Sequence, residues 1–133
     1  MHTGSCQCGN VRFEVTGPLD PIQLCHCGQC RKAQGSAFAA NIPVQEDNLT
    51  FTAGEDQLSA YESSPGKTRY FCPRCGSPIC SRTTKFPGVV RLRAGTLDGT
   101  VESRPGLHIY AAHKANWHTI NDDLPQFAER RPH

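Results

Sequence analysis

Eight cysteines dominate the chemistry that this chain of 133 residues can perform. Cys80 is isolated, and the other seven lie in three close groups: Cys6 and Cys8, then Cys25, Cys27 and Cys30, then Cys72 and Cys75. Cysteines one or two residues apart are poorly placed to form a disulfide with each other, but their thiolates can bind one metal ion together. An even number of cysteines also allows four disulfides. Because the polar N-terminal segment shows no secretion signal, the sequence favours metal binding in the cytoplasm.

The segment Cys72-Pro73-Arg74-Cys75-Gly76 has the form of a zinc knuckle, a tight turn that directs backbone N–H groups at the sulfurs. A lone C-x-x-C could instead be a redox pair, but here a second pair is available to complete a tetrahedral site. Cys6 and Cys8 supply that pair. The four thiolates together predict a closed, structural Zn²⁺ site that joins the start of the chain to its middle.

Cys25, Cys27 and Cys30 form a C-x-C-x-x-C group that offers three thiolates to a second Zn²⁺. Three protein ligands leave one coordination position open, which is the arrangement of a catalytic zinc. A fourth protein ligand would close this site and make both zinc ions structural. The available residues are Cys80, His26, His108, His113 and His118. We interpret His26 as a spacer between two ligands and Cys80 as a buried or free thiol, and we expect two Zn²⁺ per chain.

The charge of the chain gives little indication of a nucleic-acid partner. The formal net charge is +2, and seven thiolates with two Zn²⁺ would change it to about −1. Basic runs and aromatic–basic interleaving are absent, and no apolar run reaches the roughly 18 residues of a membrane span. We expect neither a nucleic-acid nor a membrane partner. Four cations beside the cysteines either favour the thiolates or form ordinary solvated surface: Arg31, Lys32, Arg74 and Arg82.

The elements that must position these cysteines are short and mainly β. Alternation of apolar and polar residues predicts strands at 9–15 and 88–94. Further candidate strands are 36–44 (with Pro43 near an edge), 48–52, 58–62, 67–71 and 107–111. Residues 29–34 precede Gly35 and predict a short helix or turn.

The length predicts one zinc-stabilised domain over 1–133, made of several short antiparallel strands with little helix. Its core would span about residues 4 to 127. The stretch after Lys114 has apolar residues without clean periodicity, which indicates an extended tail on the domain. Its expected anchors are Trp117, Ile120, Leu124 and Phe127.

Several ordered motifs are together similar to those of one known family. They are GSCQCGNVRF at 4–13, CHCGQCRK at 25–32 and FCPRCG at 71–76, with shorter matches at 95–98, 114–117 and 123–125. From about Gly4 to Phe127 the chain resembles the glutathione-dependent formaldehyde-activating enzyme family, the CENP-V/GFA domain. The resemblance implies a β-tent fold with a structural zinc at Cys6, Cys8, Cys72 and Cys75. It also implies an active-site zinc at Cys25, Cys27 and Cys30.

The reaction that this resemblance implies is of the carbon–sulfur lyase type. In the synthetic direction it joins glutathione and formaldehyde into S-(hydroxymethyl)glutathione, so the partner is a small-molecule thiol. Zinc would accept the glutathione sulfur as a thiolate or polarise the carbonyl. The chain departs from the family at Cys80, where an apolar or aromatic residue is expected, and it is shorter than the named enzyme. A non-catalytic zinc-binding interaction module and a thiol sensor are the alternatives.

Overall fold

The computed structural model describes residues 1–131, so the last two residues of the expected 1–133 domain lie outside the described part. Within it the chain forms ten β-strands, one α-helix and four short 3₁₀ helices, which confirms a mainly β fold with little helix. The elements are β1 (His2–Ser5), β2 (Arg12–Val15), β3 (Ile22–Cys25), α1 (Gly28–Gln34), β4 (Ala39–Gln45), η1 (Glu46–Asn48), β5 (Leu49–Ala53), η2 (Glu55–Gln57), β6 (Ser59–Ser64), β7 (Lys67–Phe71), β8 (Pro78–Thr83), β9 (Val89–Arg93), η3 (Ala94–Thr96), β10 (Pro105–Ile109) and η4 (Ala111–His113).

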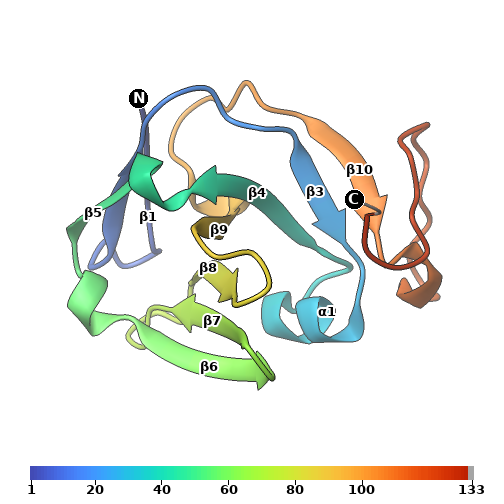
Figure 1. Cartoon of the computed structure of the whole chain (residues 1–133), viewed down its shortest axis with the longest axis horizontal. Helices are drawn as coiled ribbons and strands as arrows, with labels where there is room; N and C mark the ends of the chain where they lie inside the picture. Colours follow the sequence, from blue (N-terminus) through green and yellow to red (C-terminus); the bar gives the residue numbers. More distant parts are fainter. Residues whose placement is uncertain (132–133) are drawn as a thin grey trace.

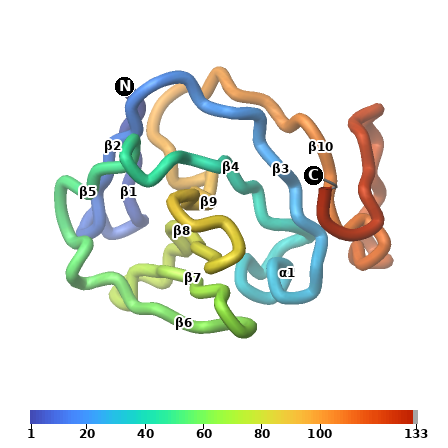
Figure 2. The backbone as a smooth tube through the Cα atoms, viewed as in Figure 1, coloured from blue at the N-terminus to red at the C-terminus, as the bar shows by residue number. Residues whose placement is uncertain are grey.

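The strands divide into two sheets. The small sheet has the order β1-β2-β5, and the large one has the order β10-β3-β4-β9-β8-β7-β6. The pairing is antiparallel except between β10 and β3, which run parallel. In Figures 1 and 2 the large sheet curls, so that β6 and β7 lie on one side of α1 and β3 and β10 lie on the other. This curl creates the concave side on which a site can form.

All seven segments that the sequence predicts as strands are confirmed, with small differences in their bounds. The 9–15, 67–71 and 88–94 segments contain or coincide with β2, β7 and β9, and the other candidates overlap β4, β5, β6 and β10. The helix expected at 29–34 is α1. Alternation did not predict β1, β3 and β8. These strands are short, and their polar and cysteine residues mask the period of two.

Proline is typical of sheet edges, so Pro43 was expected near an edge, but β4 is an interior strand of the large sheet. Pro43 pairs with Arg91 of β9, whereas the pairing of β4 with β3 ends at Asn41. At Pro43 the strand therefore has a neighbour on one side only. The missing N–H of proline interrupts no hydrogen bond on the other side, which makes the position tolerable.

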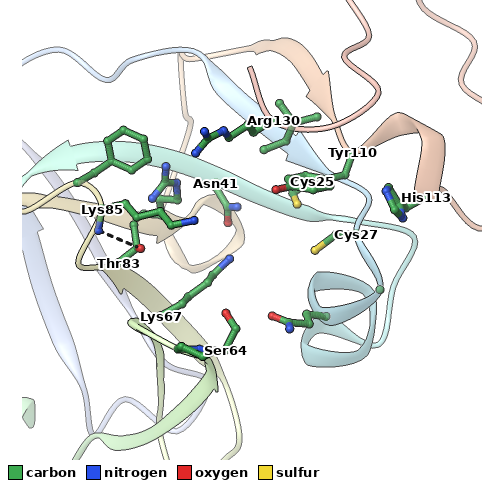
Figure 3. Close-up of a pocket in the computed structure, with 16 residues that line it drawn as sticks. Cys25, Cys27, Asn41, Ser64, Lys67, Thr83, Lys85, Tyr110, His113 and Arg130 are labelled. Carbon is green, nitrogen blue, oxygen red and sulfur yellow. Dashed lines mark hydrogen bonds between the residues drawn. The ribbon is translucent and has the colours of Figure 1, made fainter. Parts of the chain in front are cut away.

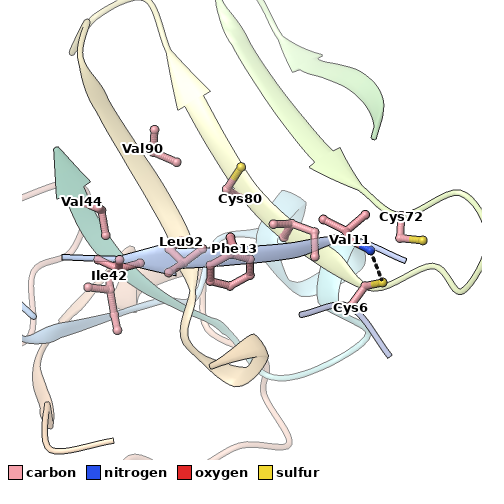
Figure 4. Close-up of a cluster of buried hydrophobic side chains, with 11 residues drawn as sticks. Cys6, Val11, Phe13, Ile42, Val44, Cys72, Cys80, Val90 and Leu92 are labelled. Atoms are coloured by element: carbon pink, nitrogen blue, oxygen red, sulfur yellow. Dashed lines mark hydrogen bonds between the residues drawn. The ribbon is translucent and has the colours of Figure 1, made fainter. Parts of the chain in front are cut away.

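The main hydrophobic core lies between the two sheets (Figure 4). Phe13, 1% exposed, reaches from β2 into the core and meets Phe51 of β5 edge to face, with ring centroids 6.1 Å apart. Cys80 of β8 is buried in the same core. The other buried members are Cys6, Val11, Val15, Ile42, Val44, Cys72, Ile79, Val90 and Leu92. Two cysteines that were expected to bind metal thus lie at the margin of the core.

The C-terminal segment returns along β10 and is held there by backbone hydrogen bonds. The N–H of Phe127 donates to the carbonyl of His108, and the N–H of His108 donates to the carbonyl of Pro125, both at 2.9 Å. Ile120, Leu124 and Phe127 are half-buried, as expected of anchors, but Trp117 is 69% exposed and does not anchor the segment. No helix within residues 1–131 is long and apolar enough to cross a membrane.

Candidate metal centres

Cys6, Cys8, Cys72 and Cys75 come together as one four-cysteine group, with all Sγ atoms within 4.8 Å of one another. The Sγ of Cys8 lies 3.6 Å from that of Cys6 and 3.9 Å from that of Cys72. Four sulfurs bound tetrahedrally at about 2.3 Å from a Zn²⁺ would lie about 3.8 Å apart, so the spacing fits such an ion. The two pairs follow β1 and β7, so the group joins the small sheet to the large one.

Tight turns present these sulfurs to one another. The N–H of Val11 donates to the Sγ of Cys6 at 3.2 Å, and the N–H of Gly76 donates to the carbonyl of Cys72 at 2.7 Å. Gly76 has a φ of 80°, which other residues adopt only with strain. The hydroxyl and the N–H of Ser77 lower the pKa of Cys75 to about 5, which favours the thiolate that binds metal.

Cys25, Cys27 and Cys30 form a second group, again with their Sγ atoms within 4.8 Å of one another. Cys25 ends β3, Cys27 is the N-cap of α1, and Cys30 lies in the first turn of that helix. The Sγ of Cys27 accepts a hydrogen bond from the N–H of Cys30 at 3.3 Å, as N-cap side chains do. The end of a strand and the start of a helix thus bring three sulfurs of one short segment together.

A buried guanidinium supports negative charge on this three-cysteine group. Arg69 of β7 is 7% exposed and donates from Nη2 to the Sγ of Cys30 at 3.6 Å. Hydrogen bonds from Cys25 and Cys27 lower the pKa of Cys30, and the charges of Arg69 and Lys67 act in the same direction. Hydrogen bonds with the other two thiols raise the pKa of Cys25. Because three adjacent thiolates repel one another, all three ionise together only around a cation, and this donor set fits Zn²⁺.

A cavity of about 520 Å³ opens beside the three-cysteine group, with Cys25 and Cys27 in its wall (Figure 3). The rest of the wall comes from α1, β4, β9, β10 and η4, the β6–β7 and β8–β9 hairpins, and the C-terminal segment. Within residues 1–131 no Asp or Glu lines it, whereas four cations do: Lys67, Lys85, Arg91 and Arg130. A positively charged cavity of this size suits a small anionic ligand.

Tyr110 turns the chain into this cavity directly after β10. Its φ of 55° is uncommon for a residue other than glycine, and such conformations cluster at functional sites. The phenol lies beside Cys25 in Figure 3. Burial raises its pKa, so the hydroxyl keeps its proton at neutral pH. His113 lines the same wall, and its Nε2 contacts the carboxylate of Glu129 at 2.9 Å.

The five alternative fourth ligands all lie outside the three-cysteine group that the described residues form. Cys80 is in the core, where burial raises its pKa to about 11. The Nε2 of His26 lies 2.8 Å from the Nδ1 of His108, so these two histidines face each other. Burial, with the charge of His108, lowers the pKa of His26 to about 4. His118 stacks on His26, and His113 contacts Glu129.

Sequence reasoning missed Arg69 and the cations of the cavity. Of the cations adjacent to cysteines in the sequence, Arg31 donates to the carbonyls of His26 and His113 at 3.4 Å, and Arg82 pairs with Glu46 at 3.2 Å. The cations near the thiols come from hairpins and strands distant in sequence. Their one visible signal is the spacing of Lys67 and Arg69, which puts both on one face of a strand.

Comparisons with known proteins agree with these cysteine groups. The family model described as glutathione-dependent formaldehyde-activating enzyme matches residues 1–113. A protein of Halomonas elongata named after this activity is 34% identical over 123 residues, which cover 86% of this chain and 77% of that protein. A similarly named protein of Talaromyces marneffei is 30% identical over 82 residues, or 60% of this chain and 44% of that protein.

A solved structure supports the fold independently of the sequence matches. The crystal structure of a Rhodobacter sphaeroides protein superposes with a TM-score of 0.64 at 22% identity. The match covers 77% of this chain and 97% of that one. The family model extends over more than four fifths of the sequence and includes all eight cysteines. The chain therefore belongs to the glutathione-dependent formaldehyde-activating enzyme family.

Proposed function

We propose that this protein is a zinc-dependent enzyme of the carbon–sulfur lyase type that makes or breaks an adduct between an anionic thiol and a small aldehyde. The names of its family and relatives point to glutathione and formaldehyde as the substrates. The observation that carries the proposal is the three-cysteine group beside a cavity whose wall contains Cys25, Cys27 and four cations. Under this proposal one Zn²⁺ has a structural role at the four-cysteine group, and a second has a catalytic role at Cys25, Cys27 and Cys30.

The cavity supports a thiol that carries carboxylates. Glutathione has two carboxylates and one ammonium, and Lys67, Lys85, Arg91 and Arg130 offer several positions for the carboxylates. Charge-assisted hydrogen bonds of this kind orient a ligand as well as bind it. With the carboxylates held by these cations, the substrate sulfur would lie near Cys25 and Cys27 in the same cavity. A cytoplasmic location fits this role, because both the ligand thiols and the substrate thiol need a reducing compartment.

The reaction itself forms or breaks one C–S bond. In the synthetic direction the thiol sulfur attacks the aldehyde carbon, and the thiol proton ends on the former carbonyl oxygen. A Zn²⁺ held by Cys25, Cys27 and Cys30 would supply Lewis acidity to this reaction. Arg69 supports the charge of Cys30, and we assign to the Tyr110 hydroxyl a hydrogen bond to the aldehyde oxygen.

A rate measurement tests the proposal directly. We expect the protein to accelerate S-(hydroxymethyl)glutathione formation above the spontaneous rate, as measured by exchange NMR. Cys27→Ser should remove the acceleration while the four-cysteine group still holds its metal. Metal analysis with and without glutathione belongs to the same experiment. If both zinc ions stay bound and do not respond to glutathione, and the reaction is not accelerated, the proposed enzyme activity is wrong and a zinc-binding interaction module is favoured.

A further inference from the structure

A hydrogen-bond chain connects the surface of the molecule to the residue between two cysteines of the three-cysteine group. His26 separates Cys25 from Cys27 and is fully buried. Its Nε2 lies 2.8 Å from the Nδ1 of His108. The Nε2 of His108 lies 3.1 and 3.0 Å from the two carboxylate oxygens of Asp122. His108 is 2% exposed and Asp122 is 44% exposed, so the chain of three side chains runs from solvent into the protein.

The backbone and the ring of His26 are both held in place. Its N–H donates to the carbonyl of Ile109 at 3.1 Å, and its carbonyl accepts from Arg31 at 3.4 Å. Phe38 meets the ring edge to face at 5.5 Å between centroids, and His118 stacks on it at 5.9 Å. A residue that served only as a spacer would need none of these contacts. The contacts instead fix the orientation of the peptide that carries both cysteines.

The direction of donation along the hydrogen bonds from His26 to Asp122 follows from the carboxylate at the outer end. A carboxylate only accepts hydrogen bonds, so the Nε2 of His108 donates to Asp122, and its Nδ1 can then accept from the Nε2–H of His26. Burial would raise the pKa of Asp122, but the N–H of Leu124 and His108 hold it below the usual range. Among residues 1–131 the Nδ1 of His26 has no hydrogen-bond partner. Among the described residues, the bond to His108 is therefore the hydrogen bond that orients this ring, together with the ring contacts of Phe38 and His118.

Hydrogen bonds of the C-terminal segment also hold His108 and Asp122 in place relative to each other. The backbone of His108 forms two hydrogen bonds of 2.9 Å, one with Pro125 and one with Phe127. These two residues flank Gln126, which pairs with His108. The N–H of Leu124 donates to the carboxylate of Asp122 at 3.0 Å. The C-terminal segment thus presents Asp122 to His108 in one defined position.

From this geometry we infer that Asp122 and His108 are positioning residues, which hold His26 and thereby set the metal affinity and coordination geometry of Cys25, Cys27 and Cys30. The inference rests on the metal-binding part of the proposed function and not on the reaction. Partners beyond the ligands commonly change metal affinity by about 10-fold to 100-fold when they are removed. The C-terminal segment would then act on the centre without contributing a ligand to it.

The test compares two adjacent carboxylates. Asp122→Asn removes the negative charge from the acceptor of His108 and replaces one of the two oxygens that contact it with an amide NH2, whereas Asp123→Asn removes the same charge from an exposed neighbour and serves as the matched control. We expect Asp122→Asn to lower the Zn²⁺ affinity of the three-cysteine group about tenfold, measured by competition with a chromophoric chelator. Asp123→Asn should leave the affinity unchanged. The affinity of the four-cysteine group should be the same in both variants and serves as the internal control.

A spectroscopic measurement separates positioning from general destabilisation. With Co²⁺ in place of Zn²⁺, the spectrum of the three-cysteine group is obtained by subtracting that of Cys27→Ser. Asp122→Asn should change the d–d bands of this difference spectrum, and His108→Leu should change them further. Unchanged bands and affinity in Asp122→Asn would overturn the inference, as would an equal loss of affinity at both groups. No thiol or aldehyde is added, so an inactive protein would still give a decisive result.

Discussion

At the scale of single residues, the eight cysteines have the same type of side chain but lie in three different environments. The four-cysteine group lies where the two sheets meet. The three-cysteine group lies beside the cavity, and Arg69 donates a hydrogen bond to its Cys30. Cys80 lies in the core at 2% exposure and belongs to neither cysteine group. Burial raises the pKa of Cys80 and outweighs the opposing charges of Arg82 and Arg93, so Cys80 should behave as a small hydrophobic residue and not as a ligand.

We expect Cys80→Ala to keep both metal ions per chain and to lose about 1 to 3 kcal/mol of stability through the space it leaves. The pKa of Cys80 rises from its usual value of 9.0 to about 11 on folding. Its burial therefore stabilises the fold fully below about pH 9, and this contribution is lost as pH rises toward 11. The stability difference between the wild type and Cys80→Ala should shrink from about pH 8 to about pH 10 in denaturant titrations. Loss of one metal ion in this variant would instead make Cys80 a ligand.

Lys85→Met should weaken binding of the anionic thiol, because Lys85 lines the cavity from the β8–β9 hairpin. We expect KM for glutathione to rise about threefold to tenfold with little change in kcat, since the contact is the same before and during reaction. Lys32→Met is the matched control, because Lys32 is exposed on α1 and lies outside the cavity wall. Equal effects of the two substitutions would indicate a general charge effect and no carboxylate site.

At the scale of elements, the position of α1 decides the position of Cys27 and Cys30. The helix has only seven residues, so its ends determine whether it forms. Cys27 caps the N-terminus with its sulfur, and Gly35 caps the C-terminus in a left-handed conformation with φ 61°. Two of the three sulfurs therefore depend on a helix with little intrinsic stability, and the N-cap bond couples helix formation to ligand geometry.

Gly35→Ala should lower the free energy of unfolding by about 1 to 2 kcal/mol, because a side chain disfavours the left-handed conformation. Gly95→Ala is the control: neither glycine has an atom within 4 Å of an added Cβ, but only Gly35 has a positive φ. Because neither substitution introduces a steric clash, a lower thermal stability of Gly35→Ala than of Gly95→Ala would measure backbone strain. A Gly35→Ala protein as stable as Gly95→Ala would show that the end of α1 can rearrange without cost.

At the scale of the whole molecule, the two cysteine groups restrain the chain very differently. The four-cysteine group joins Cys8 to Cys72, which are 64 residues apart in sequence, across the junction of the two sheets. A link that closes so long a loop removes much conformational entropy from the unfolded chain. The three-cysteine group spans only one strand end and one helix start, so a metal ion there restrains only a local segment.

Removal of one ligand from each group should therefore have unequal consequences. We expect Cys72→Ser to lose soluble, folded protein, because it opens the junction between the sheets. Cys27→Ser should stay folded and lose one of two metal ions. Metal content and circular dichroism of the purified variants provide the comparison, and a graded chelator titration of the wild type should show loss of one ion before unfolding. If both variants unfold alike, the assignment of a structural and a catalytic group is wrong.

The two sets of cysteines, seven of the ten strands and the short helix before Gly35 could be predicted from the sequence. Spacing along the chain carries this information, because ligands one to three residues apart and a period of two are local properties. Four features appear only in the folded chain: the parallel pairing of β3 with β10, the cations of the cavity, the contact of Arg69 with Cys30, and the hydrogen bonds that join His26 to His108 and His108 to Asp122. These contacts join residues from different parts of the chain through the curl of the sheet and the return of the C-terminal segment. Apart from the two-residue spacing of Lys67 and Arg69, no pattern in the sequence indicates them.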